Sequence, residues 1–262
     1  THNYSQLQAF SDGNTYILLN EAAGSVVRRV DTGAQTALGA LDNVNTPRWH
    51  PGLRNILVFY DTNEDETVRL QFGNADNGQI TDHFVFPDNY DRIQVNQSFD
   101  EMSDDGRWIA GMAALNNEDD MIFSLDVTNN RLGAQISLRE LYRGACQRDP
   151  EYGEVPPDWI GVSPLGRYLV VNWARDGVDR CSGQETFDIA TGRFIGHSYD
   201  GRQHGDLAVT PDGQEVFVTI SSQSPEVSGF PAIVRYELPN GAANPALIKT
   251  VPWHGLEHIS CR

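Results

Sequence analysis

A chain of 262 residues with 39% hydrophobic residues, 24 Gly and 13 Pro is long enough to bury a large core and has the turn-rich composition of an all-β protein. Its 36 acidic and 19 basic residues give a net charge of −17. This charge excludes sequence-independent electrostatic binding to nucleic acid or to an anionic membrane, and it suits an extracellular or saline setting. No apolar run is long enough to cross a membrane and Thr1 starts no signal-peptide pattern, so we expect a soluble chain, either mature or cut from a longer one.

A unit of strand, turn and strand recurs along the chain. In each copy a Gly-containing turn separates two runs of β-forming residues, which predicts a β-hairpin. The copies are AFSDGNTYILLN (9–20), WHPGLRNILVFY (49–60), EMSDDGRWIAGM (101–112), VSPLGRYLVVNW (162–173) and QHGDLAVTPDGQEVFV (203–218). The turn glycines Gly13, Gly52, Gly106, Gly166 and Gly213 are 39, 54, 60 and 47 positions apart, close to the ~40–50-residue period of a four-stranded propeller blade.

A third apolar strand with an Asp-containing turn follows each hairpin, and a weaker fourth strand follows most of them. We therefore predict one all-β domain over 1–262, a β-propeller of four-stranded antiparallel blades. The five blades are expected at about 4–41, 44–92, 95–142, 155–199 and 203–252, with the first strand of a sixth at 253–262. Because a propeller closes its ring with whole blades, we expect the ring to be incomplete in this chain. A five-bladed ring with a C-terminal tail is the alternative.

The hairpin turns resemble the TolB-type, WD40-like propeller repeat, in which a strand is followed by Ser/Thr-Pro-Asp-Gly. Thr210-Pro211-Asp212-Gly213 matches fully, whereas Ser103-Asp104-Asp105-Gly106 and Ser163-Pro164-Leu165-Gly166 each depart by one residue. The resemblance covers nearly the whole chain. It implies the fold and leaves the function open, because propellers carry many activities.

Three cysteines are present, and none is part of a Cys-x-x-Cys pair. Cys146 lies in the insertion between blades three and four, and Cys181 lies in the expanded hairpin loop of blade four. We predict that they meet on one rim as a disulfide, which implies a secreted or periplasmic location. Cys261 is left for a partner elsewhere, and zinc binding by a Cys/His mixture is the alternative.

Two histidines occupy the same place in successive repeats. His204 and His254 are fifty positions apart, each is followed by Gly, and Thr210 or Ser260 stands six positions after each. We expect them on adjacent inner strands at one mouth of the channel, with Asp206 and His258 nearby, as a site for a transition metal or for acid–base chemistry. A structural hydrogen-bonding role for both histidines is the alternative. His50, directly at a turn, is expected to be structural.

An acidic stretch and an aromatic rim are the other candidates. Asp61, Asn63 and Asp65 place oxygen ligands alternately, as calcium requires, but a solvent-exposed loop is the favoured interpretation. Around blade four, Tyr152, Trp159 and Trp173 offer rings for stacking on sugars, and Arg175 and Arg202 offer cations for carboxylates. Core packing is the alternative for these rings and is favoured for Trp159.

The pattern of Gln203, His204, His254 and His258 on TolB-like blades is similar to the metal-binding inner strands of propeller polysaccharide lyases of the oligogalacturonate-lyase type and, less specifically, the ulvan-lyase type. This similarity implies an enzyme that cleaves a uronic-acid polysaccharide or oligosaccharide by β-elimination, with a divalent metal (Mn, Zn or Ca) as cofactor. His204, His254 and His258 would then hold the metal or act as base. Arg202 or Arg175 would bind the uronate carboxylate. A non-catalytic glycan- or protein-binding propeller is the main alternative, and a glycoside hydrolase is the third.

Overall fold

The computed structural model describes 6–10, 16–21, 24–38, 48–62, 67–94, 101–116, 120–138, 157, 159–163, 165–173, 183–199, 204–210, 215–220, 232–237 and 246–250. These residues form strands and turns, except that the backbone of Leu138, directly after the last strand of the third sheet, is helical. No helix among them is therefore long and apolar enough to span a membrane.

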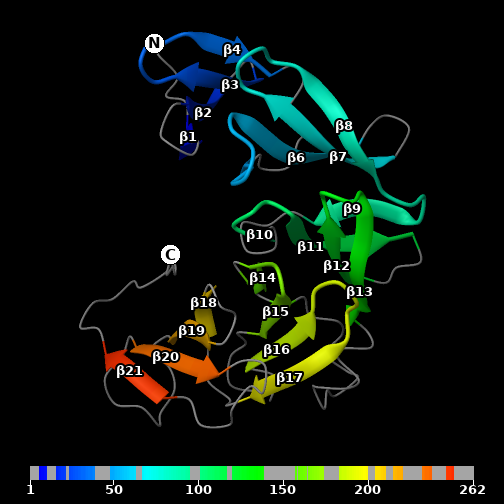
Figure 1. The fold of residues 1–262 in the computed structure, drawn as a ribbon, viewed down its shortest axis with the longest axis vertical. Helices are drawn as coiled ribbons and strands as arrows, with labels where there is room; N and C mark the ends of the chain where they lie inside the picture. Colours follow the sequence, from blue (N-terminus) through cyan, green and yellow to red (C-terminus); the bar gives the residue numbers. More distant parts are fainter. Residues whose placement is uncertain are drawn as a thin grey trace. The chain divides into compact units, whose positions relative to one another are not determined.

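Five antiparallel sheets follow one another along the chain, and in each the sequence-adjacent strands are hydrogen-bonded neighbours. Figure 1 shows them in chain order, and we name them blades one to five. Blade one holds β1 (Gln6–Phe10), β2 (Tyr16–Glu21), β3 (Gly24–Arg29) and β4 (Gln35–Ala37). Blade two holds β5 (Arg48–Trp49), β6 (Ile56–Thr62), β7 (Val68–Asn74) and β8 (Ile80–Val85).

Blade three holds β10 (Glu101–Met102), β11 (Trp108–Leu115), β12 (Asp120–Asp126) and β13 (Arg131–Ser137), and β9 (Tyr90–Gln94) also pairs with β11. Blade four holds β14 (Trp159–Val162), β15 (Tyr168–Trp173), β16 (Gly183–Asp188) and β17 (Phe194–Tyr199). Blade five holds β18 (His204–Val209), β19 (Glu215–Ile220), β20 (Ala232–Glu237) and β21 (Ala246–Thr250). All five predicted hairpins and the all-β, four-stranded blade fold are confirmed.

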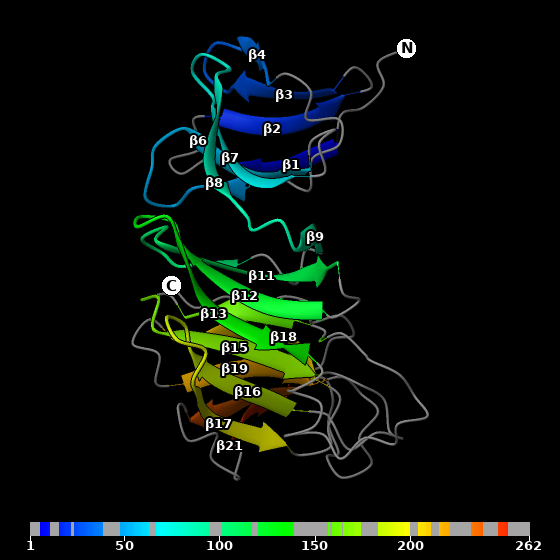
Figure 2. The ribbon, with the colours of Figure 1, turned by 90° about the vertical axis from the view of Figure 1, so that its right-hand side faces the viewer.

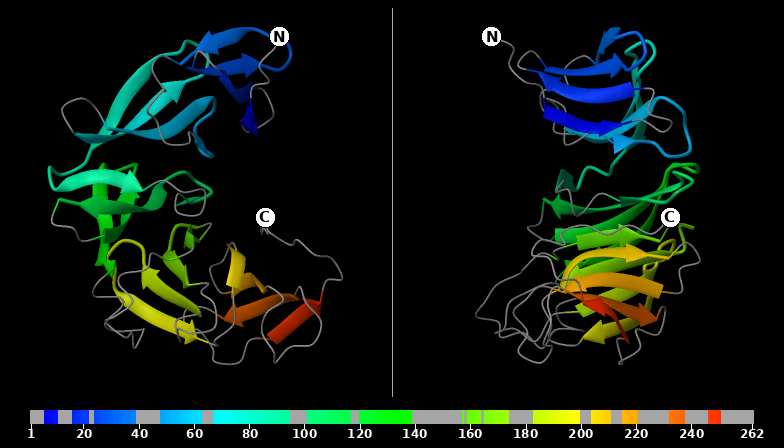
Figure 3. Two further views of the ribbon diagram at one scale, coloured as in Figure 1. Left: turned by 180° about the vertical axis from the view of Figure 1, so that it is seen from behind. Right: turned by 90° about the vertical axis from the view of Figure 1, so that its left-hand side faces the viewer.

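The chain divides into two compact units, each of which packs its own blades. The first comprises Thr1–Val95 with Ala114–Asn117, and the second comprises Asn96–Ala113 with Glu118–Arg262. In the second unit, the sheets of blades three and four are stacked face to face (Figure 2), and the inner strand β14 contacts both β10 and β18. The views in Figure 3 show the same succession of sheets within this unit. The prediction of a single domain over 1–262 stays a prediction.

Each unit has a core between neighbouring blades. In the first unit, blades one and two bury Tyr16, Leu18, Val27, Leu38, Leu57, Phe59 and Ala75 against one another. In the second, blades three and four bury Trp108, Ala110, Met112, Ile122, Ala134, Ile136, Leu138, Ile160, Val162, Leu169, Val171, Phe187 and Ile189. Since side chains alternate between the two faces of a strand, one face of each blade is apolar for its neighbour.

Candidate functional site

Each blade has two ends that differ in chemistry. At one end, which we call the turn end, short turns join the first strand to the second and the third to the fourth. At the other end, the connection end, segments of two to about twenty residues join the second strand to the third and one blade to the next. The segments 139–158, 174–182 and 221–231 belong to connections of this kind. Loops of such length are where binding and catalytic residues usually gather on a rigid scaffold.

At the turn end, the residue before each hairpin turn forms the same backbone hydrogen bond in four blades. The backbone N–H groups of His50, Ser103, Ser163 and Thr210 donate across the hairpin to Ile56 (2.8 Å), Trp108, Tyr168 and Glu215 (each 2.9 Å). In blades three to five the hydroxyl oxygen also accepts the N–H of that opposite residue, at 3.0 Å in each case. Positions 50, 103, 163 and 210 are therefore equivalent in these four hairpins.

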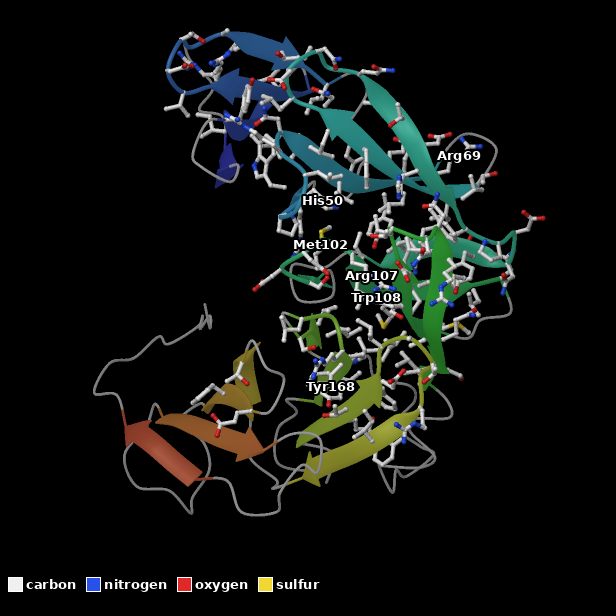
Figure 4. All side chains as sticks on the ribbon, viewed as in Figure 1. His50, Arg69, Met102, Arg107, Trp108 and Tyr168 are labelled. Carbon is white, nitrogen blue, oxygen red and sulfur yellow. The ribbon has the colours of Figure 1, made fainter. Side chains whose placement is uncertain are left out.

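His50 replaces that hydroxyl in blade two. Its side chain is 5% exposed, and Nδ1 accepts the backbone N–H groups of Gly52 at 3.0 Å and Leu53 at 2.9 Å. Figure 4 shows the ring beside blade two, where it meets the edge of Phe72. The prediction that His50 is structural is confirmed. The left-handed residue of this turn is Asn55 (φ 60°), in place of the expected Gly52, because the turn is one residue longer than those of blades three and four.

The two turns of a blade are tied together at this end. In each of blades two, three and four, a backbone N–H of the second turn donates to a carbonyl oxygen of the first. The pairs are Ala75 to Asn55 (2.9 Å), Val127 to Arg107 (2.7 Å) and Ile189 to Arg167 (3.2 Å). The four-residue turns that follow the third strands repeat as well, with Gly33, Gly78, Asn130 and Gly192 as their left-handed residues. Asn130 shows that the position needs a residue tolerant of positive φ, not glycine alone.

A buried carboxylate strengthens the turn end of blade three. The side chain of Asp126 is fully buried and accepts hydrogen bonds from Arg107 Nη2 (2.9 Å), Arg107 Nε (3.2 Å) and Asn129 Nδ2 (2.8 Å). Burial alone would raise the pKa of Asp126, but the hydrogen bonds from Arg107 and Asn129 outweigh it and hold the pKa below its usual value. Arg107 also lies over the ring of Trp108, with 5.5 Å to the ring centroid (Figure 4).

In the first unit, a second carboxylate links the turn ends of blades one and two. Tyr16 donates its hydroxyl to Asp76, and Asn55 Nδ2 donates to the same carboxylate at 3.1 Å. The hydrogen bond from Tyr16, followed by that from Asn55, holds the pKa of Asp76 below its usual value. Hydrogen bonds to carboxylates thus occupy the turn ends of blades one, two and three. We therefore place the candidate site at the connection end.

Two of the predicted metal ligands have their backbone at the connection end. His204 is the first residue of β18, opposite Ile220 of β19, and Asp206 follows it on the same strand. The register of the two strands shifts between His204 and Leu207, so this end of the pairing is irregular. His254 and His258 lie outside the described residues. The side chains of His204 and Asp206 lie outside them as well.

Two of the predicted substrate residues have their backbone at the connection end of blade four. Trp173 ends β15, opposite Gly183, and Trp159 begins β14 at the same end of the sheet. Arg175 belongs to the segment between β15 and β16, Arg202 to the four residues before β18, and Tyr152 to the segment before β14; these three lie outside the described residues. The structure therefore places the backbones of Trp159 and Trp173 at one end of blade four.

The acidic stretch of blade two begins differently from the prediction. Strand β6 continues through Thr62, so Asp61 is a half-buried strand residue opposite Arg69, and the expectation of an exposed loop from Asp61 onwards was wrong. Hydrogen bonding to β7 is what extends the strand. Asn63 and Asp65 lie outside the described residues, as do Cys146, Cys181 and Cys261. Among the described residues, no three His, Cys, Asp or Glu side chains converge as metal ligands do.

Strand pairing in blade four aligns residues that the sequence does not bring together. Trp159, already a candidate from the sequence, lies opposite Asn172, and the same line continues through Gln184 and Ser198 near the connection end. We call them the polar row. The strand spacing alone does not reveal the row, because the lengths of the intervening loops conceal the register; an alignment of the hairpins extended into the third and fourth strands would have found it.

Comparison with known proteins finds solved structures of similar fold. No protein-family model matches the chain, and no curated protein sequence matches it. An oligogalacturonate lyase solved in complex with manganese superposes with a TM-score of 0.63 at 10% identity, over 96% of this chain and 66% of that one. The likeness is one of β-propeller fold.

Other solved propellers agree. The oligogalacturonate lyase of Vibrio parahaemolyticus gives a TM-score of 0.59 at 10% identity, over 96% of this chain and 66% of that one. A putative TolB of Agrobacterium tumefaciens gives a TM-score of 0.51 at 14% identity, over 93% of this chain and 80% of that one. Both predicted resemblances, to TolB-like propellers and to oligogalacturonate lyases, are thus found in the fold. The chain spans just under two thirds of the length of the lyases.

Proposed function

We propose that this protein is a secreted or periplasmic carbohydrate-active propeller, a polysaccharide lyase that cleaves a uronic-acid glycan by β-elimination. One observation carries the proposal. His204 begins an inner strand at the connection end, and His254 repeats its sequence context fifty positions later, in a fold whose solved neighbours include oligogalacturonate lyases.

The arginines of the connections are concentrated, in the sequence, next to blade four. The connections 39–47, 63–66, 95–100 and 117–119 of the first three blades contain neither Arg nor Lys. The connections 139–158, 174–182 and 200–203 contain eight acidic residues together with Arg139, Arg143, Arg148, Arg175, Arg180 and Arg202. These guanidinium groups are the ones that could pair with a uronate carboxylate near blade four.

The reaction needs a charge-neutralising group, a base and a leaving oxygen. In our assignment Arg202 or Arg175 binds the uronate carboxylate, which stabilises the negative charge that develops when the proton is lost. A histidine, His204 or His254, takes the proton from C5. The C4–O bond then breaks, its electron pair leaves with the glycosidic oxygen, and that oxygen gains a proton. The products are a 4,5-unsaturated uronate and a new chain end, while Trp173 and Tyr152 stack on neighbouring sugars.

A divalent cation fits the predicted donor set. Imidazole nitrogens of His204, His254 and His258 with the carboxylate of Asp206 suit manganese or zinc, and calcium at Asp61, Asn63 and Asp65 is the oxygen-only alternative. When bound beside the substrate, such a cation would neutralise the carboxylate. His204 and Asp206 come from one strand, which places two of the proposed ligands on a common backbone support.

The test is the rise of ultraviolet absorbance from unsaturated uronate, measured on polygalacturonate and other uronate polymers. We expect His204→Ala and His254→Ala to abolish it with little change in melting temperature. His83→Ala is the matched control, since His83 stacks on Phe72 in the first unit (centroids 4.1 Å apart) and should leave the rate unchanged. Loss of melting temperature in both site variants would instead assign the histidines a structural role. Binding without product would assign a glycan-binding propeller.

The location is tested separately through the cysteines. Mass mapping under non-reducing conditions should find Cys146 bonded to Cys181, as expected for an oxidising compartment. Two free thiols in protein prepared without reductant would contradict both the disulfide and the argument for secretion drawn from it.

A further inference from the structure

The turn between β7 and β8 of blade two contains an Asn-Gly dipeptide, Asn77-Gly78. In the four described turns that follow third strands, the residue before the left-handed position is Thr32, Asn77, Asn129 or Thr191. Among these turns, that of blade two alone combines asparagine with a following glycine. The side chain of Asn77 is exposed to solvent, and Gly78 is half-buried.

The fold requires glycine at position 78. Its φ is +73°, a conformation that residues with a Cβ atom rarely adopt. An added Cβ would also lie 2.7 Å from the carbonyl oxygen of Ala37 and 3.1 Å from Thr36 Cγ2. Both of these residues belong to β4 of blade one, so the turn packs closely against its neighbour within the first unit.

The same turn requires a hydrogen-bond acceptor at position 77. Asn77 Oδ1 accepts the backbone N–H of Gln79 at 2.9 Å. In blades one and four, the hydroxyl oxygens of Thr32 and Thr191 accept the N–H two residues further on, each at 3.3 Å. A short side chain with an oxygen acceptor is thus common to these turns, and only asparagine also carries an amide that can be displaced.

We infer that Asn77 is a site of spontaneous deamidation in the folded protein. The backbone nitrogen of Gly78 loses its proton and bonds to Asn77 Cγ, the Cγ–Nδ2 bond breaks, and Nδ2 takes up a proton and leaves as ammonia. Water then opens the cyclic imide at one of its two carbonyl carbons, which gives aspartate or isoaspartate. Glycine favours the ring closure because no Cβ atom obstructs the approach of its nitrogen.

One hydrogen bond sets the rate of this reaction in the folded state. The N–H of Gly78 donates to the carbonyl oxygen of Asn74 at 2.8 Å, so its nitrogen is engaged until the turn opens. Exposed turns open locally at a smaller free-energy cost than the whole domain. Deamidation of Asn77 should therefore be slower in the folded protein than in the unfolded chain, but it should proceed without global unfolding.

The two products differ in what they do to the junction of blades one and two. Aspartate at position 77 keeps an oxygen acceptor for the N–H of Gln79. Isoaspartate adds a methylene group to the main chain directly before Gly78, which has no spare room against Ala37. Accumulation of isoaspartate should therefore loosen the packing of this turn against blade one.

The test is to incubate the intact protein at mildly alkaline pH and to map its peptides by mass spectrometry and retention time. We expect Asn77 to convert, while Asn129 stays intact because the next residue is Asn130 and its amide donates to Asp126 at 2.8 Å. Peptide-level mapping keeps Asn77 apart from the second Asn-Gly dipeptide, Asn240-Gly241, which lies outside the described residues.

Two variants serve as controls. Asn77→Thr copies blades one and four and should keep the melting temperature of the fresh protein within about 2 °C of the parent. On incubation the parent should lose about 2–5 °C as isoaspartate accumulates, and Asn77→Thr should not. Asn77→Asp represents the aspartate product, and a melting temperature close to that of the fresh parent separates the added charge from the altered backbone.

The outcomes decide the inference. Conversion of Asn77 in the folded protein, at a lower rate than in urea, supports it. An intact Asn77 in the folded protein, over a period in which the urea-unfolded chain is fully converted, overturns it. An equal loss of melting temperature in the parent and in Asn77→Thr would refute the effect on the junction of blades one and two.

Discussion

Gly133 is the position where an added methyl group should do most damage. It lies on β13 of blade three, and a Cβ atom there would come within 2.6 Å of Ser124 Oγ, 2.7 Å of the carbonyl oxygen of Ile189 and 2.7 Å of Trp108 Cζ3. Ser124 is fully buried and donates to that same carbonyl of blade four at 2.5 Å, while its oxygen accepts the Ala134 N–H at 2.8 Å. None of the three neighbours can move without breaking the junction between blades three and four.

The expected cost of Gly133→Ala follows from these contacts. Overpacking of a filled core costs about 1–3 kcal/mol, and weakening the hydrogen bond between Ser124 and Ile189 adds about 1 kcal/mol. The free energy of unfolding should therefore fall by about 2–4 kcal/mol, a large part of the ~5–15 kcal/mol of a typical domain. Urea unfolding followed by tryptophan fluorescence measures it, because Trp108 lies at the altered contact.

Two further variants make the reasoning refutable. Gly73→Ala is the control, since its Cβ would be close only to Phe59 Cε1 at 3.1 Å, with Leu38 and Leu57 at ordinary contact distances of 3.7 and 3.8 Å, and should cost about 1 kcal/mol or less. Ser124→Ala removes one of the three close neighbours and leaves the backbone carbonyl, so the double variant with Gly133→Ala should stay destabilised. A Gly133→Ala protein within about 0.5 kcal/mol of the parent would show that the junction between the blades is looser than these distances state.

Asp126→Ala should lower the free energy of unfolding, measured by urea titration, by about 2–4 kcal/mol at pH 7. Because the folded-state pKa of Asp126 lies below its usual value, the difference in unfolding free energy between variant and parent should shrink as pH falls from about 5 towards 3. A difference that does not change with pH would contradict an ionised, hydrogen-bonded carboxylate. His50→Ala should lower the free energy of unfolding by about 1–3 kcal/mol, because the backbone N–H groups of Gly52 and Leu53 lose their acceptor. His50→Asn keeps an acceptor and should restore part of that free energy. Equal losses for the two variants in chemical denaturation would refute the role of Nδ1. Because the net charge is −17, repulsion between acidic side chains should destabilise the folded protein at low salt. The melting temperature, measured by calorimetry, should therefore rise between about 0.01 and 1 M NaCl as this repulsion is screened. An unchanged melting temperature would show that repulsion between the acidic side chains does not destabilise the folded state.

The amino-acid sequence by itself determined the all-β class, the hairpins and the repeated turn motif that begins at Ser103, Ser163 and Thr210. Those features are local: a turn residue, a side-chain acceptor and two β-forming runs lie within a few positions of one another, so periodicity is enough to recognise them. The sequence also singled out His204, because its Gly-containing context recurs at a fixed distance.

The tertiary structure decided what depends on register and on contacts between blades. Asp61 is in a strand because β7 pairs with it up to Thr62, and no local signal marks that end. Gly133 matters because Ile189, far away in sequence, approaches it. The polar row exists only once Asn172, Gln184 and Ser198 are aligned across strands of unequal separation. Such relationships are set by cooperative packing over long sequence distances, which is why a single sequence shows the elements of this fold more readily than the residues they bring together.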